Sequence, residues 1–223
     1  KHTILENLDC VFPSAKLTVL LGPNGCGKST LLKAAAGLME LKRGTVRIDG
    51  QTKLSPTERA QRLAYLPQSR NVPQITARRM VLHGRFPYLG YPRRYRAEDL
   101  RIADEALAAV GMANEADCEL TELSGGQRQK VYLAMLLAQQ TDCVLLDEPT
   151  TYLDIACQLD TWALCEQMRD SGKTVVAVTH EIPQALRYAN RLLLMQSGRI
   201  AAQGTPEEIL EQGVLEDVFS GEV

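Results

Sequence analysis

The feature that most constrains the fold is a glycine-rich run at residues 22–30, which reads Gly22, Pro23, Asn24, Gly25, Cys26, Gly27, Lys28, Ser29 and Thr30. The run matches the pattern G-x-x-x-x-G-K-[ST], which is typical of phosphate-binding loops (P-loops). Apolar residues 17–21 precede it, and residues 31–36, which are rich in helix formers, follow it. This order predicts a strand, a phosphate-binding loop and a helix, which is the context that the pattern requires.

The residue types in this run suit the phosphates of a nucleotide. Glycines let the backbone curl so that N–H groups point at phosphate oxygens, and the next helix presents its N-terminus to the same anion. We expect Lys28 to contact the β- and γ-phosphates and the Ser29 hydroxyl to coordinate Mg²⁺. The alternative is a glycine-rich turn that carries a surface lysine, and the flanking strand and helix argue against it.

The composition indicates a packed globular protein. Of the 223 residues, 45 % are hydrophobic and 23 % are charged, and the formal net charge is −2. The runs of Lys and Arg are too short to indicate nucleic-acid binding. The six cysteines are scattered, which favours a reducing cytoplasm over disulfides or a metal cluster. No apolar run approaches the ~18–20 residues of a membrane-spanning helix. We therefore expect a soluble chain that begins after a trimmed N-terminus and would reach a membrane only through a partner.

Hydrophobic periodicity divides the chain into an α/β core and a helical insertion. Strands are expected at residues 3–12, 17–21, 45–48, 63–67, 143–146, 174–179, 191–196 and 199–203. Helices are expected at residues 28–38, 97–110, 127–140 and 181–190, and from Pro206 onward. We predict a single domain, in which residues 1–69 and 141–223 form the nucleotide-binding core and residues 70–140 form a helical subdomain.

A second motif lies at residues 143–148, where four apolar residues end in Asp147 and Glu148. A buried strand would deliver Asp147 at its carboxyl end, where ligands bind in open α/β sheets. This pattern is typical of a Walker B motif, in which Asp147 holds the metal and Glu148 polarises the attacking water. Alone, the pattern could also be a strand end with two solvated carboxylates, but the P-loop upstream favours the catalytic interpretation.

A third motif comprises Leu123, Ser124, Gly125, Gly126 and Gln127. Ser124 is a suitable N-cap for a helix, but a plain cap does not require two glycines. Bare backbone N–H groups at a helix N-terminus form a second anion site, although an ordinary capped helix is the alternative. A chain with a P-loop and a second phosphate site suggests two copies that enclose ATP between them.

Together these motifs resemble those of the ATP-binding-cassette (ABC) ATPase family. Residues 123–127 match the family signature, and the resemblance covers nearly the whole chain. Further landmarks occur in the family's order: Gln68 matches the Q-loop, Tyr152, Leu153 and Asp154 match the D-loop, and His180 matches the switch histidine. The resemblance implies a P-loop NTPase (RecA-like) α/β core with an N-terminal antiparallel β subdomain and an inserted α-helical subdomain that carries the signature.

The resemblance also implies a role for each matched residue. Gln68 would reach Mg²⁺ and the attacking water, and His180 would contact the γ-phosphate. Ser124 and Gly126 would act in trans, on the ATP of a second copy. Alone, Gln68 would be interpreted as a solvated polar residue and His180 as a packed histidine, but their positions after strands favour positioning roles in phosphoryl transfer. The expected catalytic set is Lys28, Gln68, Glu148 and His180, and the expected Mg²⁺ ligands are Ser29, Gln68 and Asp147.

Two segments resemble a narrower group, the importers of iron–siderophore complexes, haem and cobalamin. Residues 84–90 are similar to its G-R-x-P-x-x-G segment, and residues 148–155 are typical of it. This resemblance implies that about residues 70–95 contact a membrane permease, and we expect Arg85 and Tyr88 to take part. The alternative for residues 84–90 is a Pro-rich surface turn. Cys157 departs from the resemblance, which implies a histidine at that position.

The favoured hypothesis is therefore the ATP-hydrolysing subunit of an importer, at the cytoplasmic face of the membrane. It would use ATP and Mg²⁺, form a homodimer, bind permease subunits and act only indirectly on a substrate-binding protein. Two alternatives stay open: an ABC exporter subunit, and a non-transport ABC protein that acts on nucleic acid or the ribosome. The transported substrate is not encoded in this chain, and we expect an iron–siderophore.

Overall fold

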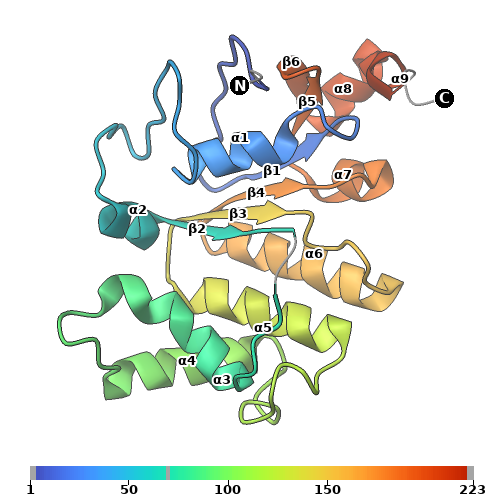
Figure 1. Ribbon diagram of the computed structural model, residues 1–223. Helices are drawn as coiled ribbons and strands as arrows, with labels where there is room; N and C mark the ends of the chain where they lie inside the picture. The colour runs from blue at the N-terminus through green and yellow to red at the C-terminus, as the bar shows by residue number, and fades with distance from the viewer. Residues whose placement is uncertain (1–3, 69–70, 220–223) are drawn as a thin grey trace.

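A six-stranded sheet forms the centre of the molecule (Figure 1). The computed structural model describes residues 4–68 and 71–219. In spatial order the strands are β2 (Leu63–Leu66), β3 (Cys143–Asp147), β4 (Thr174–Val178), β1 (Leu17–Leu21), β5 (Arg191–Gln196) and β6 (Arg199–Gly204). The first five strands are parallel, and β6 pairs antiparallel with β5. Every residue of β1 is buried, which is why all of its residues except Thr18 are apolar and its sequence does not alternate.

Helices cover both faces of this sheet. On one face, α1 (Lys28–Ala35) packs Leu31 and Leu32 against side chains of the strands. The other face is covered by α6 (Ile155–Asp170), α7 (Ile182–Tyr188), α8 (Pro206–Gln212) and α9 (Val214–Phe219), as Figure 1 shows. Trp162 of α6 is fully buried there and stacks on Tyr188 with 5.5 Å between ring centroids. This sandwich of helices and parallel strands is the α/β architecture expected around the P-loop.

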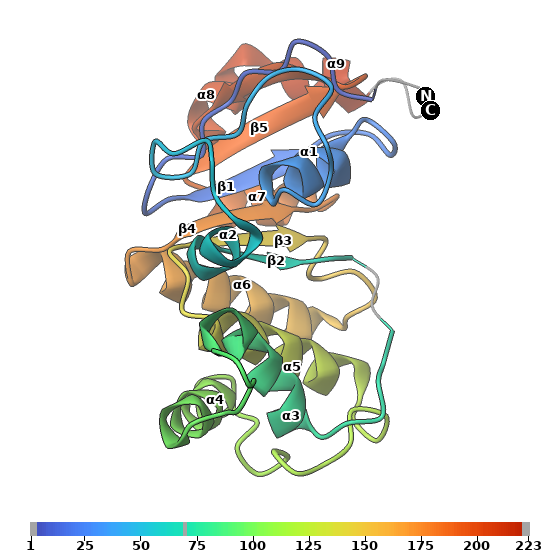
Figure 2. The ribbon, with the colours of Figure 1, turned by 60° about the vertical axis from the view of Figure 1, so that its left-hand side comes forward.

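A further group of helices lies beyond α6 (Figures 1 and 2). It consists of α3 (Ala77–Leu82), the 3₁₀ helix η1 (His83–Tyr88), α4 (Ala97–Ala109) and α5 (Gly125–Ala138). These helices enclose a hydrophobic cluster of their own, while α5 also packs Leu133 and Leu136 into the cluster beneath the sheet. The division into a core and a helical subdomain stays a prediction, and its first boundary, at residues 69–70, lies outside the described residues.

The prediction of an N-terminal antiparallel β subdomain is wrong, because neither of the two strands expected for it is present in the described residues. Within residues 4–16 no strand is present, because positive φ angles at Asn7 and Ala15 interrupt the extended backbone; Thr3 lies outside the described residues. Residues 45–48 also form no strand. The expected turn at Asp49 and Gly50 does form, with positive φ at both residues, but it joins only one bridge, between Ile48 and Gln51. Exposed polar residues after the turn offer no apolar face on which a longer pair could pack.

The other expected elements are present with small shifts at their ends. The hairpin of β5 and β6 turns at Ser197 and Gly198, as predicted. The helix after the P-loop is shorter than expected, since it ends at Ala35 and Gly37 follows with a positive φ of 72°. A short helix, α2 (Pro56–Arg62), was not predicted. Among the described residues, no helix has the length and apolar character required to cross a bilayer.

Candidate nucleotide-binding and hydrolysis site

The P-loop follows β1 in a conformation that requires glycine. Gly22 has a φ of 150°, and a Cβ at this position would lie 2.1 Å from the carbonyl oxygen of Met195. Gly27 caps α1 in the left-handed region, with a φ of 110°. The loop therefore turns sharply into the N-terminus of α1, where unpaired N–H groups and the helix dipole favour an anion.

Lys28 lies inside this loop and is only 5 % exposed. Its Nζ donates hydrogen bonds to the carbonyl oxygens of Gly22, at 2.6 Å, and Pro23, at 2.9 Å. An ammonium group has three donors and no acceptor, so carbonyl oxygens satisfy part of its hydrogen-bonding capacity. The loop thus holds a cation at the position where phosphates would be bound.

Asp147 connects the P-loop helix to the neighbouring strands. It ends β3 and is 2 % exposed. Its Oδ1 accepts a hydrogen bond from the Ser29 hydroxyl at 2.8 Å, and its Oδ2 accepts one from the Tyr65 hydroxyl at 3.1 Å. Burial and the nearby Asp147 charge raise the pKa of Tyr65, so its hydroxyl stays protonated and donates. Carboxylate and hydroxyl oxygens are suitable Mg²⁺ ligands, so Ser29 and Asp147 fit the expected metal.

Tyr65 was not predicted from the sequence. It lies on β2, three residues before Gln68, and would be interpreted there as an ordinary strand residue. Because β2 pairs with β3 in parallel, with Leu66 opposite Leu146, the end of β2 lies beside Asp147. Only this pairing reveals the contact.

Glu148 forms hydrogen bonds with residues that follow the two strands on either side of β3. Gln68, after β2, donates its Nε2 to Glu148 Oε2 at 2.5 Å, and His180, after β4, has its Nε2 2.5 Å from Oε1. The Thr151 hydroxyl also donates to Oε2, at 3.1 Å. Glu148 has a φ of 51°, a conformation that non-glycine residues adopt at a cost of about 1–3 kcal/mol and that is common at functional sites. Two residues that are distant in sequence, Gln68 and His180, and the nearby Thr151 thus converge on one carboxylate.

The predicted D-loop, Tyr152, Leu153 and Asp154, follows directly. Tyr152 is fully exposed, with a φ of 65°, so its ring is available to another molecule. Asp154 is the N-cap of α6, where its Oδ1 accepts a hydrogen bond from the Cys157 N–H at 2.8 Å. The backbone N–H of Cys157 lowers the pKa of Asp154, as expected for a carboxylate at a helix N-terminus.

The predicted signature forms the beginning of α5. Ser124 and Gln127 form a capping box: the Ser124 hydroxyl accepts from the Gln127 N–H at 3.2 Å, and the Gln127 side chain accepts from the Ser124 N–H at 3.0 Å. Leu123 is buried, while Ser124 and Gly125 are exposed. Figure 1 shows that α5 and the P-loop lie on opposite sides of the sheet and α6. The fold therefore keeps the signature apart from the P-loop of the same chain.

Arg85 does not lie where a partner could contact it, contrary to our expectation. It is 6 % exposed, and its guanidinium donates to Asp99 Oδ1 at 3.0 Å and to the Ala138 carbonyl at 2.8 Å. The Tyr88 hydroxyl donates to the Gln139 carbonyl at 2.7 Å. A Cβ at Gly84 would lie 2.3 Å from the Met135 carbonyl oxygen. Residues 84–88 thus pack η1 against the end of α5. The Arg85 guanidinium is buried, so it takes its hydrogen-bond partners from its own chain.

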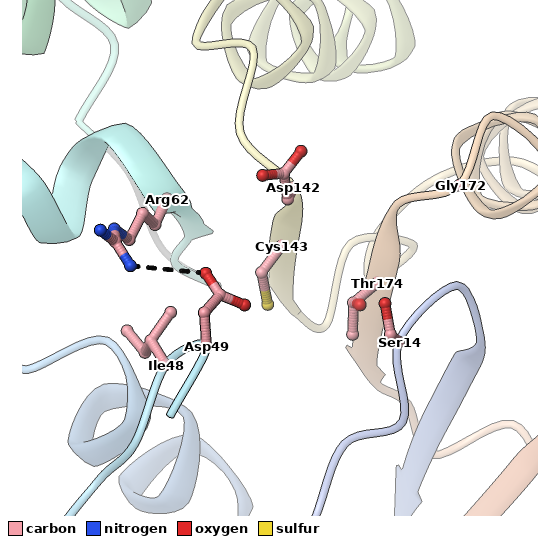
Figure 3. Close-up of a pocket in the computed structure, with 8 residues that line it drawn as sticks. All are labelled: Ser14, Ile48, Asp49, Arg62, Asp142, Cys143, Gly172 and Thr174. Atoms are coloured by element: carbon pink, nitrogen blue, oxygen red, sulfur yellow. Dashed lines mark ion pairs between the residues drawn. The ribbon is translucent and has the colours of Figure 1, made fainter. Parts of the chain in front are cut away.

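A polar cavity of about 240 Å³ lies at the opposite edge of the sheet, where β3 and β4 begin (Figure 3). An ion pair between Arg62 and Asp49, at 3.7 Å, borders it. Burial raises the pKa of the Cys143 thiol to about 12. None of the predicted site residues lines this cavity.

The sheet order, the P-loop at the end of β1 and the acidic residues at the end of β3 define a P-loop NTPase. Residues 5–151 match the sequence model of the family described as ABC transporter. The chain belongs to this family, and it is an ABC-type ATP hydrolase that binds nucleotide. The resemblance inferred from the motifs and the α/β P-loop fold are confirmed.

Individual relatives narrow the comparison. The chain is 41 % identical to the ferric enterobactin transport ATP-binding protein FepC of Escherichia coli, over 98 % of this chain and 82 % of that protein. It is 38 % identical to the hemin import ATP-binding protein HmuV of Rhodococcus jostii, over 97 % of this chain and 74 % of that protein.

Solved structures are similar throughout the fold. An inward-facing structure of a metal-chelate type ABC transporter matches with 30 % identity and a TM-score of 0.81, over 93 % of this chain and 78 % of that chain. A dimeric ATP-binding cassette bound to ADP and phosphate matches with 27 % identity and a TM-score of 0.80, over 91 % of this chain and 90 % of that chain.

Proposed function

We propose that this chain is the ATP-hydrolysing subunit of an ABC importer, bound at the cytoplasmic face of the cell membrane, and that it energises uptake of an iron–siderophore or hemin. The observation that carries the hydrolytic part is the convergence of Gln68 and His180 on Glu148, beside the Ser29–Asp147 pair. The import part is supported by the names of the relatives, which are ATP-binding proteins for ferric enterobactin and for hemin. These relatives favour import over export or a role on nucleic acid.

ATP and Mg²⁺ are the proposed ligands of the carboxyl edge. The loop at residues 22–30 would hold the triphosphate with its N–H groups, and Lys28 would exchange its carbonyl partners for phosphate oxygens. Ser29, Asp147 and Gln68 would hold Mg²⁺, which neutralises charge on the β- and γ-phosphates. The Tyr65 hydroxyl would orient the Asp147 carboxylate.

Glu148 is the proposed general base. It would accept a proton from the water that attacks the γ-phosphate, since its carboxylate lies beside the metal-binding pair and is held by two side chains. Gln68 and His180 would position that water and the γ-phosphate. Phosphoryl transfer depends mainly on positioning and electrostatic stabilisation, and a fixed carboxylate with neighbouring hydrogen-bond donors can provide both.

A second copy of the chain is the proposed partner at the nucleotide. Ser124 and Gly126, with the exposed Gly125 between them, lie beyond α6 from the P-loop of their own chain, so they would contact the ATP of the second copy. The exposed D-loop residue Tyr152 would lie at the same interface. The similarity to a dimeric cassette structure supports this arrangement.

Permease subunits are the proposed membrane partners, in contact with about residues 70–95. Because Arg85 is buried, the contact would use exposed side chains of the same region: Phe86, Tyr91, Arg93 and Arg94. The ring of Phe86 packs near Tyr95, with 6.1 Å between centroids, and gives this surface an aromatic and basic character. A substrate-binding protein would act only through the permease.

Replacing the base tests the hydrolytic proposal. We expect Glu148→Gln to lower kcat at least 100-fold, because an amide cannot accept the proton, while ATP still binds. Steady-state phosphate release and binding of a fluorescent ATP analogue measure the two effects. Glu181→Gln, a carboxylate change one residue after His180, is the matched control and should keep most activity. Wild-type turnover in Glu148→Gln would remove Glu148 from this role.

Replacing exposed residues tests the permease surface. We expect Tyr91→Ala combined with Arg93→Ala to reduce uptake of radiolabelled ferric siderophore or hemin in cells, while the purified subunit retains its ATPase rate. The exposed Leu210→Ala on α8 serves as control. Unchanged uptake with the double variant would move the permease contact elsewhere.

A further inference from the structure

The two glycines of the signature differ in what surrounds them. Both lie in the first turn of α5, and neither has a positive φ. A Cβ built at Gly125 would meet no atom of the described chain within 4 Å. A Cβ built at Gly126 would lie 2.3 Å from Cys157 Sγ, which is too close for real atoms, and 3.5 Å from Cys157 Cβ, which is ordinary contact. Of the two glycines, only Gly126 therefore faces a side chain of its own chain so closely that an added methyl group would have to displace Cys157 Sγ.

Cys157 is itself fixed by the D-loop. It lies in the first turn of α6, where its N–H donates to Asp154 Oδ1 at 2.8 Å and its carbonyl accepts from the Thr161 hydroxyl at 2.8 Å. Asp154 is the last residue of the predicted D-loop, so the capping bond connects that loop directly to the residue that faces Gly126.

A second contact joins the same two helices one turn further along. Lys130 Nζ of α5 lies 2.8 Å from Asp160 Oδ2 of α6. Lys130 is four residues after Gly126, and Asp160 is three residues after Cys157, so both contacts lie on the same pair of helix faces. This ion pair is partly exposed and adds little energy alone, but it is a second point at which α5 and α6 contact each other.

We infer that Cys157 is a positioning residue for the signature: its side chain sets how closely Gly126 approaches α6, and thereby couples the D-loop to the signature within one chain. The inference rests on the proposed function, in which both elements meet a second copy across bound ATP. Any movement of the first turn of α6 would be transmitted to the signature backbone, because atoms in close contact cannot approach further. Burial raises the pKa of the Cys157 thiol, so at neutral pH it is a compact, uncharged group that suits a packing role.

A double-substitution experiment tests this contact, with Gly125 as the matched control. Gly126→Ala places a methyl group against Sγ, and Cys157→Ala removes Sγ. We expect Gly126→Ala to lower the unfolding temperature of the nucleotide-free subunit by about 5 °C and to lower kcat at saturating ATP about 10- to 100-fold. When Cys157→Ala is added to Gly126→Ala, kcat should return to within about threefold, and the unfolding temperature to within a few degrees, of the values for Cys157→Ala alone.

Gly125→Ala separates this effect from the contact with the second copy. It should not lower the unfolding temperature, because its methyl group meets open space in a helix, and any loss of kcat should persist when Cys157→Ala is added. ATP-dependent dimer formation, followed by light scattering with Glu148→Gln in every variant, adds a readout independent of turnover. ATP affinity of the monomer should be the same in all variants, because none of the changes touches the P-loop.

If Gly126→Ala leaves the unfolding temperature unchanged, or if Cys157→Ala fails to restore kcat and dimer formation to Gly126→Ala, the contact does not position the signature. Failure of the proposed function would differ, because Glu148→Gln with otherwise unchanged residues would then show no ATP-dependent dimer.

Discussion

At the scale of single residues, Asp147 shows how the site is supported from outside the motifs. Its two carboxylate oxygens bond to different elements, Oδ1 to Ser29 of the P-loop helix and Oδ2 to Tyr65 of β2. A carboxylate held at both oxygens has a defined orientation toward a metal ion, and such outer contacts affect metal affinity about 10- to 100-fold.

Removing the Tyr65 hydroxyl should therefore weaken the proposed metal site without unfolding the strand. We expect Tyr65→Phe to raise the Mg²⁺ concentration for half-maximal ATPase activity about tenfold, because Asp147 loses one of its two orienting bonds. Titrating Mg²⁺ at fixed ATP measures this shift. Tyr91→Phe, a change at a fully exposed ring, is the control and should leave the titration unchanged. Identical titrations for Tyr65→Phe and wild type would show that the hydroxyl does not support the metal site.

The contrast between Glu148 and Tyr65 shows what could be predicted at this scale. The convergence on Glu148 could be anticipated, because Gln68 and His180 each follow an apolar strand and parallel strands end at one edge of a sheet. The Tyr65 contact depends on which strand lies beside β3, and the sequence does not specify strand order. Arg85 was expected at the permease contact because residues 84–90 resemble a segment of the importer group. Its partners, Asp99 and the Ala138 carbonyl, are distant in sequence, so no local pattern revealed them.

At the scale of elements, dependence on residues that are distant in sequence also explains why the strands expected in the N-terminal region do not form. The hairpin at residues 191–204 was predictable because its turn and both strands are local and one face is apolar. Residues 45–48 have a good turn but no apolar surface to cover, so pairing stops after one bridge. Local signals predict a turn well, whereas the length of a strand depends on what the rest of the chain offers for packing.

The junction of η1, α4 and α5 allows a prediction at this scale. Arg85 is buried between these elements, with Asp99 and the Ala138 carbonyl as its partners. We expect Arg85→Ala to lower the free energy of unfolding by about 3–5 kcal/mol, because Asp99 would be left as an unpaired buried charge. Urea unfolding measures this change. Arg101→Ala, which breaks two exposed ion pairs of α4, should change stability little. A comparable loss in both variants would show that burial of the Arg85 pair is unimportant.

The same pair predicts a dependence on pH. Burial opposes ionisation of Asp99, but hydrogen bonds from the Arg96 N–H and the Arg85 guanidinium outweigh it and hold the pKa of Asp99 below its usual value of 3.8. A carboxyl group with a lowered pKa stabilises the fold fully above that usual value, and this stability is lost as pH falls through the lower, folded-state pKa. The stability advantage of wild type over Asp99→Asn should thus be constant from about pH 7 to 5 and shrink below about pH 4. Urea unfolding across this pH range measures the stability difference between wild type and Asp99→Asn. A difference that stays constant below about pH 4 would contradict a lowered pKa for Asp99.

At the scale of the whole molecule, the fold separates two parts of one predicted reaction. The P-loop and the Glu148 cluster lie at the carboxyl edge of the sheet, whereas the signature begins beyond α6 with Ser124 and Gly125 exposed. Within one chain, the signature therefore does not reach the P-loop. In the proposed function, the complete site would form between two copies related by twofold symmetry, which would give two equivalent sites at once.

Mixing two defective variants tests whether the two parts come from different copies. Lys28→Ala should disable the P-loop, and Ser124→Arg should block the signature, so each variant alone should have almost no ATPase activity. In a mixed dimer, one site combines both defects, but the other joins an intact P-loop to an intact signature. Equal mixing should thus restore activity to at most about one quarter of the wild-type rate, since about half of the dimers are mixed and each has one intact site. Phosphate release measured over a range of mixing ratios should peak near equal amounts. If the mixture never exceeds the sum of the separate variants, the signature acts within its own chain, and the exposure of Ser124 requires another explanation.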